Sequence, residues 1–311
     1  MAATFGADEL PVDTNERFTQ ANNRTFQLFD SQREQTWQGP FFFMQLADTQ
    51  YGMFTGNDGF AQEAALAERT VQHINRLRPR FVIVCGDLTN ATPDHARYHA
   101  QVQQYKRDFS QISPDIPLVC VCGNHDIGGR PTAKSIASYK THFGDDYFSF
   151  WVGGVCNLVL NSTVIKNPSG APEVLDNQQA WLEHQLATAQ EAHAKHIFLF
   201  QHHPMFLKEE GEPDQYFNIP LTRRTPLLEQ LKQAKVRAIF AGHYHRNSYG
   251  RAGEMEMITT GPVGRPLGKD PSGFRIVKVH EKHIQHKYYA VDDVPHSISV
   301  TDTTAQQSAT Q

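Results

Sequence analysis

Between about residues 37 and 294, runs of apolar residues alternate with longer amphipathic stretches, and this order predicts strands followed by helices. Five short runs are almost entirely apolar, which is typical of strands buried on both faces. They are Phe41–Leu46, Phe81–Cys85, Leu118–Cys122, Ile197–Phe200 and Val236–Phe240. Strands that alternate with helices pair in parallel through right-handed crossovers. The pattern therefore predicts an α/β fold.

Two of the intervening stretches carry apolar residues at the helical period. The first, with its stripe ending at Leu77, should stop before Pro79. The second opens with Thr92-Pro93-Asp94, which offers an N-cap and a proline for the first turn. Its stripe is Tyr98, Val102, Tyr105 and Phe109. We expect both helices to cover a sheet.

Other stretches indicate antiparallel pairing. Tyr147–Val152 and Asn157–Leu160 flank Gly153-Gly154 and predict a hairpin. Residues 254–260, 274–280 and 283–289 predict short strands without helices between them, hence an antiparallel set. Together these elements predict an α/β fold with two mixed sheets packed between two layers of helices, a four-layer α/β/β/α sandwich.

The ends of the chain differ from this central part. Residues 1–36 are polar without a sustained period, which predicts a flexible N-terminal arm. Residues 37–294 should form the catalytic domain, and the Ser/Thr/Gln-rich residues 295–311 predict a disordered tail.

Composition narrows the class of protein. A 311-residue chain that is 39% hydrophobic, with 20 Phe, can build a large core. The net charge of -4 gives no electrostatic reason to expect nucleic acid or an anionic membrane as a partner. No apolar stretch approaches the roughly 18 residues of a membrane span, and the start lacks the features of a secretory signal. Cysteines inside apolar runs are typical of buried thiols in a reducing compartment, so a cytoplasmic location is expected.

Five polar segments follow directly after the apolar runs. They are Asp48-Thr49-Gln50, Gly86-Asp87-Leu88-Thr89-Asn90, Gly123-Asn124-His125-Asp126, Gln201-His202-His203-Pro204 and Gly242-His243-Tyr244-His245. The carboxyl ends of parallel strands are where open α/β sheets bind ligands. Turn chemistry could explain Asp87 or Asn124 alone, since both residue types cap helices after strands. All five segments together predict one pocket.

This set of side chains predicts a site for two divalent metal ions that hydrolyses phosphate esters. Such ions neutralise phosphate charge and lower the pKa of a bound water towards about 7. Asp87 is the predicted bridging carboxylate. Asp48 and His245, with Gln50 as a weak fourth ligand, should hold one ion, and the other should be held by Asn124, His202 and His243. His125 is predicted to contact the phosphate and protonate the leaving group, and Asp126 to orient His125 or a neighbouring ligand.

These segments resemble the calcineurin-like metallophosphoesterase superfamily, whose pattern is D-x-H, GD-x-x-[DN], GN-H-[ED], H and GH-x-H. The match runs from about Phe41 to Tyr289. Within the superfamily, FGDDYFSFWVGG at 143–154, QHHPMF and GHYHRN resemble the cytosolic calcineurin-like phosphoesterase domain-containing group of serine/threonine phosphatases. The resemblance implies two packed mixed sheets and a dinuclear site at the positions above. Gln50 departs from the pattern, because most members have His there. A Gln carbonyl favours Mg²⁺ or Mn²⁺ and should bind its ion more weakly.

The expected activity is that of a metal-dependent phosphoester hydrolase, specifically a protein serine/threonine phosphatase in which a metal-bound hydroxide attacks phosphorus directly. The two divalent ions could be Mn, Fe, Zn or Mg. A phosphodiesterase acting on nucleotides or glycerophosphodiesters, and a non-catalytic protein-binding scaffold, stay open as alternatives. Expected partners are a phosphorylated protein or a small phosphoester, with no nucleic acid and no membrane, and the chain is expected to be a monomer.

Three further predictions concern segments outside the five polar ones. Tyr216-Phe217-Asn218, in a loop after the fourth segment, should line the substrate entrance, and Asn161-Ser162 could face the pocket. Arg223-Arg224 should open a helix and lie exposed.

Overall fold

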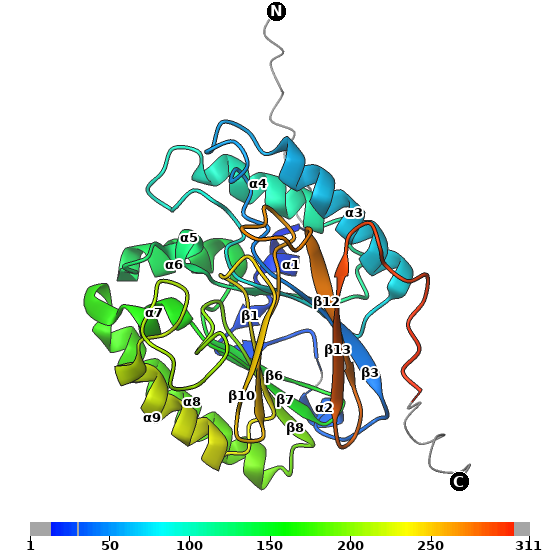
Figure 1. Cartoon of the computed structure of the whole chain (residues 1–311), viewed down its shortest axis with the longest axis vertical. Coiled ribbons are helices and arrows are strands. Elements are labelled where there is room, and N and C mark those ends of the chain that lie inside the picture. Colours follow the sequence, from blue (N-terminus) through cyan, green and yellow to red (C-terminus); the bar gives the residue numbers. More distant parts are fainter. Residues whose placement is uncertain (1–13, 30, 302–311) are drawn as a thin grey trace, which may run out of the picture.

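The computed structural model describes residues 14–29 and 31–301, which form two mixed β-sheets between layers of helices (Figure 1). The larger sheet has eight strands, in the order β1 (Ala21–Asn22), β2 (Thr25–Phe26), β6 (Phe148–Val152), β7 (Val155–Val159), β8 (His196–Phe200), β9 (Ala238–Ala241), β11 (Met255–Thr259) and β10 (Ser248–Ala252). The smaller sheet has five, in the order β13 (Ile284–Ala290), β12 (Gly273–Val279), β3 (Phe41–Leu46), β4 (Val82–Cys85) and β5 (Leu118–Val121). The predicted fold class is confirmed.

The longer helices cover the outer faces of the two sheets. The core beside the smaller sheet includes residues of α3 (Ala61–Leu77), α4 (Tyr98–Phe109) and α6 (Ala133–Phe143). The core beside the larger sheet includes residues of α8 (Pro172–Glu191) and α9 (Leu221–Gln233). The short helices are α1 (Thr14–Phe18), α2 (Ser31–Glu34), α5 (Asn124–Ile127) and α7 (Ser162–Lys166), and a 3₁₀ turn spans Pro168–Gly170. In the part of the chain that the structure describes, no helix is long and apolar enough to cross a bilayer.

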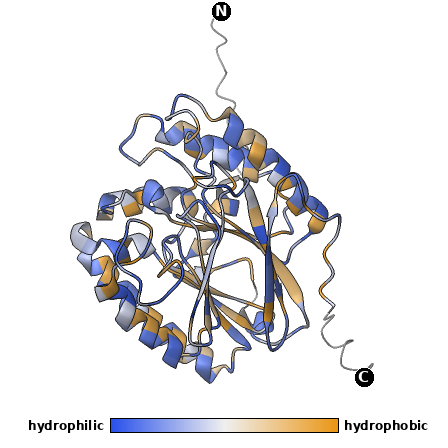
Figure 2. Cartoon of the chain, in the orientation of Figure 1, coloured by the Kyte–Doolittle hydropathy of each residue, from blue (hydrophilic) through white to orange (hydrophobic). Residues whose placement is uncertain are grey.

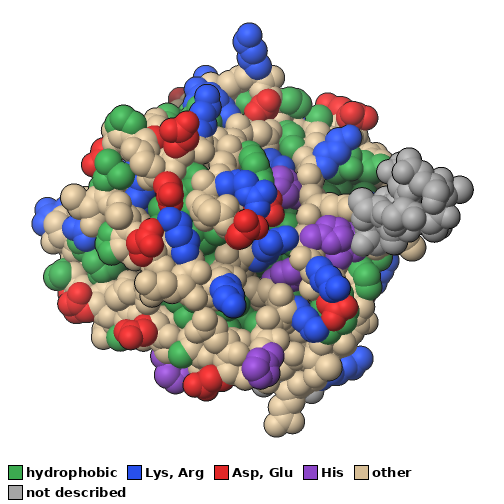
Figure 3. Space-filling model, turned by 60° about the horizontal axis from the view of Figure 1, so that its bottom comes forward, with side chains coloured by type: hydrophobic (Ala, Val, Ile, Leu, Met, Phe, Trp, Pro, Cys, Tyr) green, Lys and Arg blue, Asp and Glu red, His purple; other side chains and the backbone are tan. Residues whose placement is uncertain are grey.

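The apolar runs have no polar face because each strand is covered on both sides. On β4, Val82 and Val84 face the helices, whereas Ile83 and Cys85 face the other sheet. A third core lies between the sheets and is rich in phenylalanines, such as Phe43, which stacks on Phe81 at 4.8 Å between ring centroids. Figure 2 shows the same arrangement, with hydrophobic strands inside and mixed helices outside. On the face drawn in Figure 3, acidic and basic side chains are interspersed.

Several predicted elements are confirmed. The helix that ends at Leu77 and the hairpin of β6 and β7 are both present. The stripe on α4 is buried, although the helix begins at Tyr98 rather than at Pro93, because residues 93–97 form turns.

The predicted antiparallel set is partly wrong. β12 and β13 do pair antiparallel, but β11 lies in the other sheet, where it pairs in parallel with β9. The sequence pattern also missed β10, which pairs antiparallel with β11. This strand contains a glycine and an arginine, and its buried positions alternate with exposed ones, so it has no apolar run.

The predicted ends also need correction. The described residues before residue 37 do not behave as a loose arm, because Phe18, Ala21 and Phe26 are buried and β2 pairs with β6. At the other end, Ile298 and Val300 pack against the core beside the smaller sheet, and Arg76 donates to the carbonyl of Pro295. The folded part therefore extends beyond residues 37–294 at both ends. The rest of the two predicted terminal segments, residues 1–13 and 302–311, lies outside the described residues.

Candidate metal centre

The five polar segments meet at one edge of the double sheet. They follow β3, β4 and β5 of the smaller sheet and β8 and β9 of the larger one, and each of these two groups pairs in parallel. Just inside this edge, Gln45 Nε2 donates to the carbonyl of Ala241 at 3.0 Å and so links the two sheets. The site is therefore built on two rigid sheets whose strand ends point the same way.

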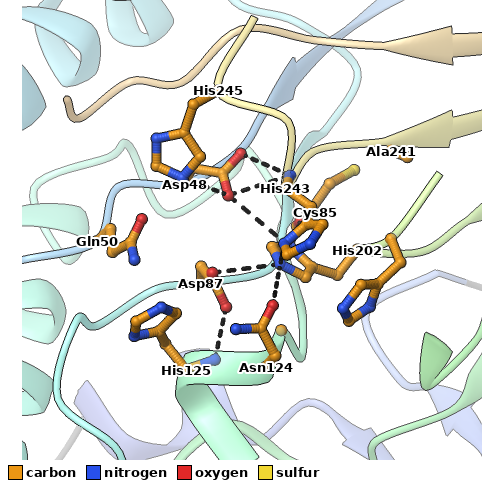
Figure 4. A network of polar contacts seen from close by, with 12 residues as sticks. Asp48, Gln50, Cys85, Asp87, Asn124, His125, His202, Ala241, His243 and His245 are labelled. Carbon is orange, nitrogen blue, oxygen red and sulfur yellow. Dashed lines mark hydrogen bonds and ion pairs between the residues drawn. The ribbon is translucent and has the colours of Figure 1, made fainter. Parts of the chain in front are cut away.

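The centre of the cluster is the Nε2 atom of His202, a buried side chain (Figure 4). This nitrogen lies 3.2 Å from Asp87 Oδ2, 3.1 Å from Asn124 Oδ1 and 3.1 Å from His243 Nδ1. A single N–H can serve only one of these acceptors, so hydrogen bonding alone leaves the set poorly satisfied. A carboxylate, an amide oxygen and two imidazoles are a ligand set that suits a divalent cation.

A second group lies beside the first and is centred on Asp48. Its Oδ1 lies 3.3 Å from His245 Nε2, and its carboxylate accepts the backbone N–H of His243 at 3.0–3.1 Å. Asp48, Asp87 and His202 each offer a ligand atom, and these atoms lie within 4.8 Å of one another. The two groups are thus adjacent, with Asp87 and His202 next to Asp48.

The four imidazoles are oriented by backbone carbonyls. The Nδ1–H groups of His202, His245 and His125 donate to the carbonyls of Cys85, Arg265 and Asn90, at 2.9, 2.7 and 2.5 Å. His243 is turned the other way, with Nε2 3.4 Å from the carbonyl of Tyr216. In His202, His243 and His245, the nitrogen that does not donate to a carbonyl lies against the cluster, and its lone pair is available to a cation once the ring is neutral. This is the usual way in which proteins fix metal-binding histidines.

Gln50 lies at the edge of the cluster, apart from the side chains joined by contacts in Figure 4. Its Nε2 donates to Asn90 Oδ1 at 3.2 Å, whereas its Oε1 is buried without a hydrogen-bond partner. A buried amide oxygen of this kind carries a desolvation penalty of about 1–3 kcal/mol unless a partner is present. A cation beside Gln50 would supply that partner, so the residues present fit the ions that the sequence predicts.

His125 and Asp126 occupy different positions relative to the cluster. His125 is half-buried at the start of α5, and its backbone N–H donates to Asp87 Oδ1 at 2.8 Å. Asp126 is buried and binds only backbone, accepting N–H groups of Gly123, Leu88 and Thr89 at 2.7–3.3 Å. Of the two roles predicted for Asp126, the structure is consistent with orienting the loop that carries Asp87, because Asn90 rather than Asp126 fixes the imidazole of His125.

The backbone that carries the candidate ligands is strained. Asp48, Asp87, His243 and His245 have φ values between 51° and 67°, in the left-handed region that residues other than glycine rarely adopt. Such conformations persist where surrounding structure enforces them, and they cluster at functional sites. The backbone at Gly123 also passes very close to Asp87, since a Cβ at this position would lie 2.2 Å from Asp87 Oδ1. Only glycine lets this strand end approach the carboxylate.

Sequence reasoning underestimated two neighbouring residues. His203 was not among the predicted ligands, yet a ligand atom of His203 lies within 4.8 Å of such atoms in His202 and His243. Ser162, which could have faced the pocket, is buried behind it. Its Oγ accepts the backbone N–H groups of His202 and His203 at 3.2 and 2.9 Å and lies 3.1 Å from His203 Nδ1. The adjacent histidines were the signal available for His203, but nothing in the pattern indicated the role of Ser162.

The charges within the site shift several pKa values. Burial alone would raise the pKa of Asp87, but the neighbouring His202 and His125 hold it well below the usual range. Burial likewise opposes the charged form of His202, but Asp87 and Asp48 raise its pKa to about 9. Burial and the charge of Asp87 raise the pKa of Asp126 to about 8. The ionised carboxylate of Asp87 therefore lies beside an imidazole, that of His202, for which a proton and a metal cation would compete.

Comparison with known proteins agrees with this geometry. Residues 43–247 match the model of the calcineurin-like phosphoesterase family. The chain is 42% identical over 288 residues to the mouse (Mus musculus) protein named serine/threonine-protein phosphatase CPPED1, a match that covers 89% of this chain and 92% of that protein. Among solved structures, a dimetal phosphatase from Danio rerio superposes with a TM-score of 0.61 at 15% identity, covering 82% of this chain and 97% of that one. A purple acid phosphatase from yellow lupin superposes with a TM-score of 0.59 at 13% identity, covering 83% and 52%. The arrangement of strand ends, the His and Asp cluster and these similarities together show that the chain belongs to the calcineurin-like phosphoesterase family.

Proposed function

We propose that this chain is a metal-dependent protein serine/threonine phosphatase that uses two divalent ions held by the strand-end cluster. The observation that carries the proposal is the convergence of Asp87, Asn124 and His243 on one nitrogen of His202, beside Asp48. The similarity to the CPPED1 protein, which is named a serine/threonine-protein phosphatase, supports the substrate class.

In the proposed centre, Asp87 would be the carboxylate shared by the two ions. Asp48, Gln50 and His245 would hold one ion, and Asn124, His202 and His243 would hold the other. When bound, such a pair of ions neutralises phosphate charge and lowers the pKa of a coordinated water. The Gln50 amide and the carboxylates are hard oxygen donors, which favours Mn²⁺ or Mg²⁺.

The chain's own residues supply the remaining chemistry. His125 Nδ1 is engaged by the Asn90 carbonyl, so its Nε2 is the atom available to a phosphate oxygen or to the departing hydroxyl of a serine or threonine. Asp126 holds the loop on which Asp87 sits. Water is the proposed nucleophile, because all four cysteines are buried, and burial raises the thiol pKa values of Cys120 and Cys156 to about 12.

The test is phosphate release with added Mn²⁺ from a phosphothreonine peptide, compared with hydrolysis of bis-p-nitrophenyl phosphate. The wild type should prefer the monoester peptide, and Asp87→Asn should lose at least about 100-fold in rate together with bound metal. The control Asp58→Asn changes an exposed aspartate and should match the wild type.

Three results would contradict the proposal. Preference for the diester would indicate a phosphodiesterase. Absence of hydrolysis of either substrate would indicate a protein-binding scaffold. Full activity of Asp87→Asn would refute the assignment of the centre.

A further inference from the structure

Large apolar side chains exposed to solvent are rare among the described residues, and they are unevenly placed. Within that part of the chain the strongly exposed ones are Leu28, Tyr216, Tyr249 and Leu267, at 45%, 65%, 47% and 41% exposure. Two of them adjoin candidate metal ligands. Tyr216 adjoins His243, and Leu267 adjoins His245.

Tyr216 lies directly against His243. Its carbonyl oxygen is 3.4 Å from His243 Nε2, and its ring centroid is 5.1 Å from that of the imidazole. Phe217 continues the aromatic surface, with its ring 5.6 Å from His243 and 5.0 Å from Tyr244. The exposed ring of Tyr216 is therefore in direct contact with a candidate metal ligand, His243.

The loop that carries Tyr216 is held firmly from below. Lys166 Nζ donates to the carbonyls of Tyr216 and Asn218 at 2.8 and 2.6 Å. The fully buried guanidinium of Arg224 donates to the carbonyls of Glu210, Glu212 and Ile219. The prediction that Arg224 is exposed is therefore wrong, because this loop folds over it. An aromatic side chain on so well fixed a loop needs little further ordering when it binds a partner.

Leu267 adjoins the second of these two histidines, His245. Its backbone N–H donates to the carbonyl of His245 at 3.2 Å, and its own carbonyl accepts Nη2 of Arg246 at 2.6 Å. The same guanidinium lies 4.8 Å from the ring centroid of Tyr244 and 5.8 Å from that of Phe217. Arg246 thus joins the segment of Leu267 to the aromatic surface beside Tyr216.

We propose that Tyr216 and Leu267 form a docking pair that binds apolar side chains flanking the phosphorylated residue of a protein substrate. This inference rests on the proposed phosphatase function and adds a sequence preference to it. Removing apolar surface from water favours binding, and tyrosine is among the side chains that contribute most to the binding energy of protein interfaces. A small phosphoester is too short to reach beyond the ions, whereas a peptide that presents a phosphothreonine to them brings its neighbouring residues to the surface beside the candidate ligands, where Tyr216 and Leu267 lie.

The experiment measures KM and kcat with Mn²⁺ for Tyr216→Ala, Leu267→Ala and the double variant. Three substrates are compared: a phosphothreonine peptide with leucines on both sides, the same peptide with alanines there, and acetyl-phosphothreonine amide. The dissociation constant of a non-hydrolysable phosphonate form of the leucine peptide gives a readout independent of turnover. Tyr249→Ala and Leu28→Ala are matched controls, because they remove exposed side chains of the same types outside the candidate centre.

For the leucine peptide, the double variant should raise KM and the phosphonate dissociation constant about tenfold, with kcat within about twofold of the wild type. The alanine peptide, the amide and both control variants should behave as the wild type does. An unchanged KM for the leucine peptide, or an equal rise for all three substrates, would overturn the docking pair. A wild type that hydrolyses the diester but no phosphopeptide would refute the proposed function itself, and the docking pair with it, before any variant is made.

Discussion

Gln50 is the residue at which this centre departs from the common family pattern. Its amide oxygen is buried without a hydrogen-bond partner, while its nitrogen is engaged by Asn90. An amide oxygen is a weaker donor than imidazole for most divalent ions of the first transition row. The ion on the Asp48 side should therefore exchange more readily than its neighbour.

The variant Gln50→His tests this role of Gln50. We expect the affinity for the more weakly bound Mn²⁺ to rise about tenfold or more, because an imidazole replaces an amide oxygen. Calorimetric titration of metal-stripped protein measures both binding steps. Unchanged binding would show that residue 50 does not coordinate.

The pair formed by His202 and Asp87 predicts how stability depends on pH in the absence of metal. The pKa of His202 is raised to about 9 in the folded chain, against about 6.5 in an unfolded one. Its contribution is therefore complete below about pH 6.5 and is lost as pH rises through about 9. Between these limits the free energy of unfolding of EDTA-treated protein should fall by on the order of 2 kcal/mol.

Urea unfolding at pH 6 to 9 measures this slope. In His202→Gln the fall in stability above about pH 8 should largely disappear, whereas the exposed control His184→Gln should retain it. Below about pH 8 the variant should still lose stability as pH rises, because the pKa of the Asp126 carboxyl is raised to about 8. A wild type whose stability is flat over this range would contradict the charge pairing. A metal ion must displace the same proton, so metal binding should release protons near neutral pH.

The sequence could predict those site residues that directly follow a strand, because the ends of parallel strands lie together at one edge of the sheet. Asp87, Asn124 and His202 each follow an apolar run, and the structure brings them together. His243 and His245 also follow an apolar run, but the left-handed backbone of both residues has no signal in that pattern. Ser162 could not be assigned a role, because its contacts with residues 202 and 203 depend on how distant segments pack.

At the scale of elements, the loop between β8 and α9 is shaped by a few buried polar side chains. Arg224, on the first turn of α9, donates to three carbonyls of this loop. Glu212 accepts the backbone N–H groups of Leu207 and Lys208 at 2.8 and 3.0 Å. Arg224 and Glu212 are charged residues outside any apolar run or stripe. Their sequence positions therefore gave no sign of burial, and Arg224 was predicted to be exposed.

Arg224→Gln should remove this support. Leaving buried carbonyls without partners is expected to lower the free energy of unfolding by about 2–4 kcal/mol and to raise KM for phosphopeptides, because the loop carries Tyr216. The neighbouring Arg223→Gln is the matched control and should stay within about 0.5 kcal/mol of the wild type. Chemical denaturation of the three proteins decides the matter, and equal stability would show that Arg224 does not hold the loop.

Elements were predictable where a run or stripe was continuous and not where long-range pairing decided them. The parallel strands and α3 can be predicted from the local sequence, because each has a continuous apolar run or stripe. The sheet to which β11 belongs is set by its pairing with β9, in which Glu256 lies beside Ala238 and each partner is eighteen residues earlier in the chain. Likewise, β2 is two residues long and exists because it pairs with β6.

At the scale of the whole molecule, the layer of phenylalanines between the sheets holds the two halves of the centre in register. Asp48, Asp87 and Asn124 come from one sheet, and His202 and His243 come from the other. Phe43 contacts rings from both sheets, with centroids 4.8 Å from Phe81 and 5.4 Å from Phe240. Packing between the sheets therefore sets the distances within the site.

Phe43→Ala should open a cavity in this layer. We expect the free energy of unfolding to fall by about 3–5 kcal/mol and metal affinity to fall with it, since the sheets can then shift relative to each other. Phe43→Leu retains most of the volume and should lose less of both. A loss below about 1 kcal/mol in the alanine variant would contradict the role given to the inter-sheet layer.

Anomalous diffraction from crystals grown with Mn²⁺ tests the central claim most directly, because it locates the ions without reference to activity. The account predicts two peaks about 3.5–4 Å apart that share Asp87. One should also contact Asp48 and His245, and the other should also contact Asn124, His202 and His243. A single peak away from Asp87, or no peak among these residues, would contradict the proposed centre.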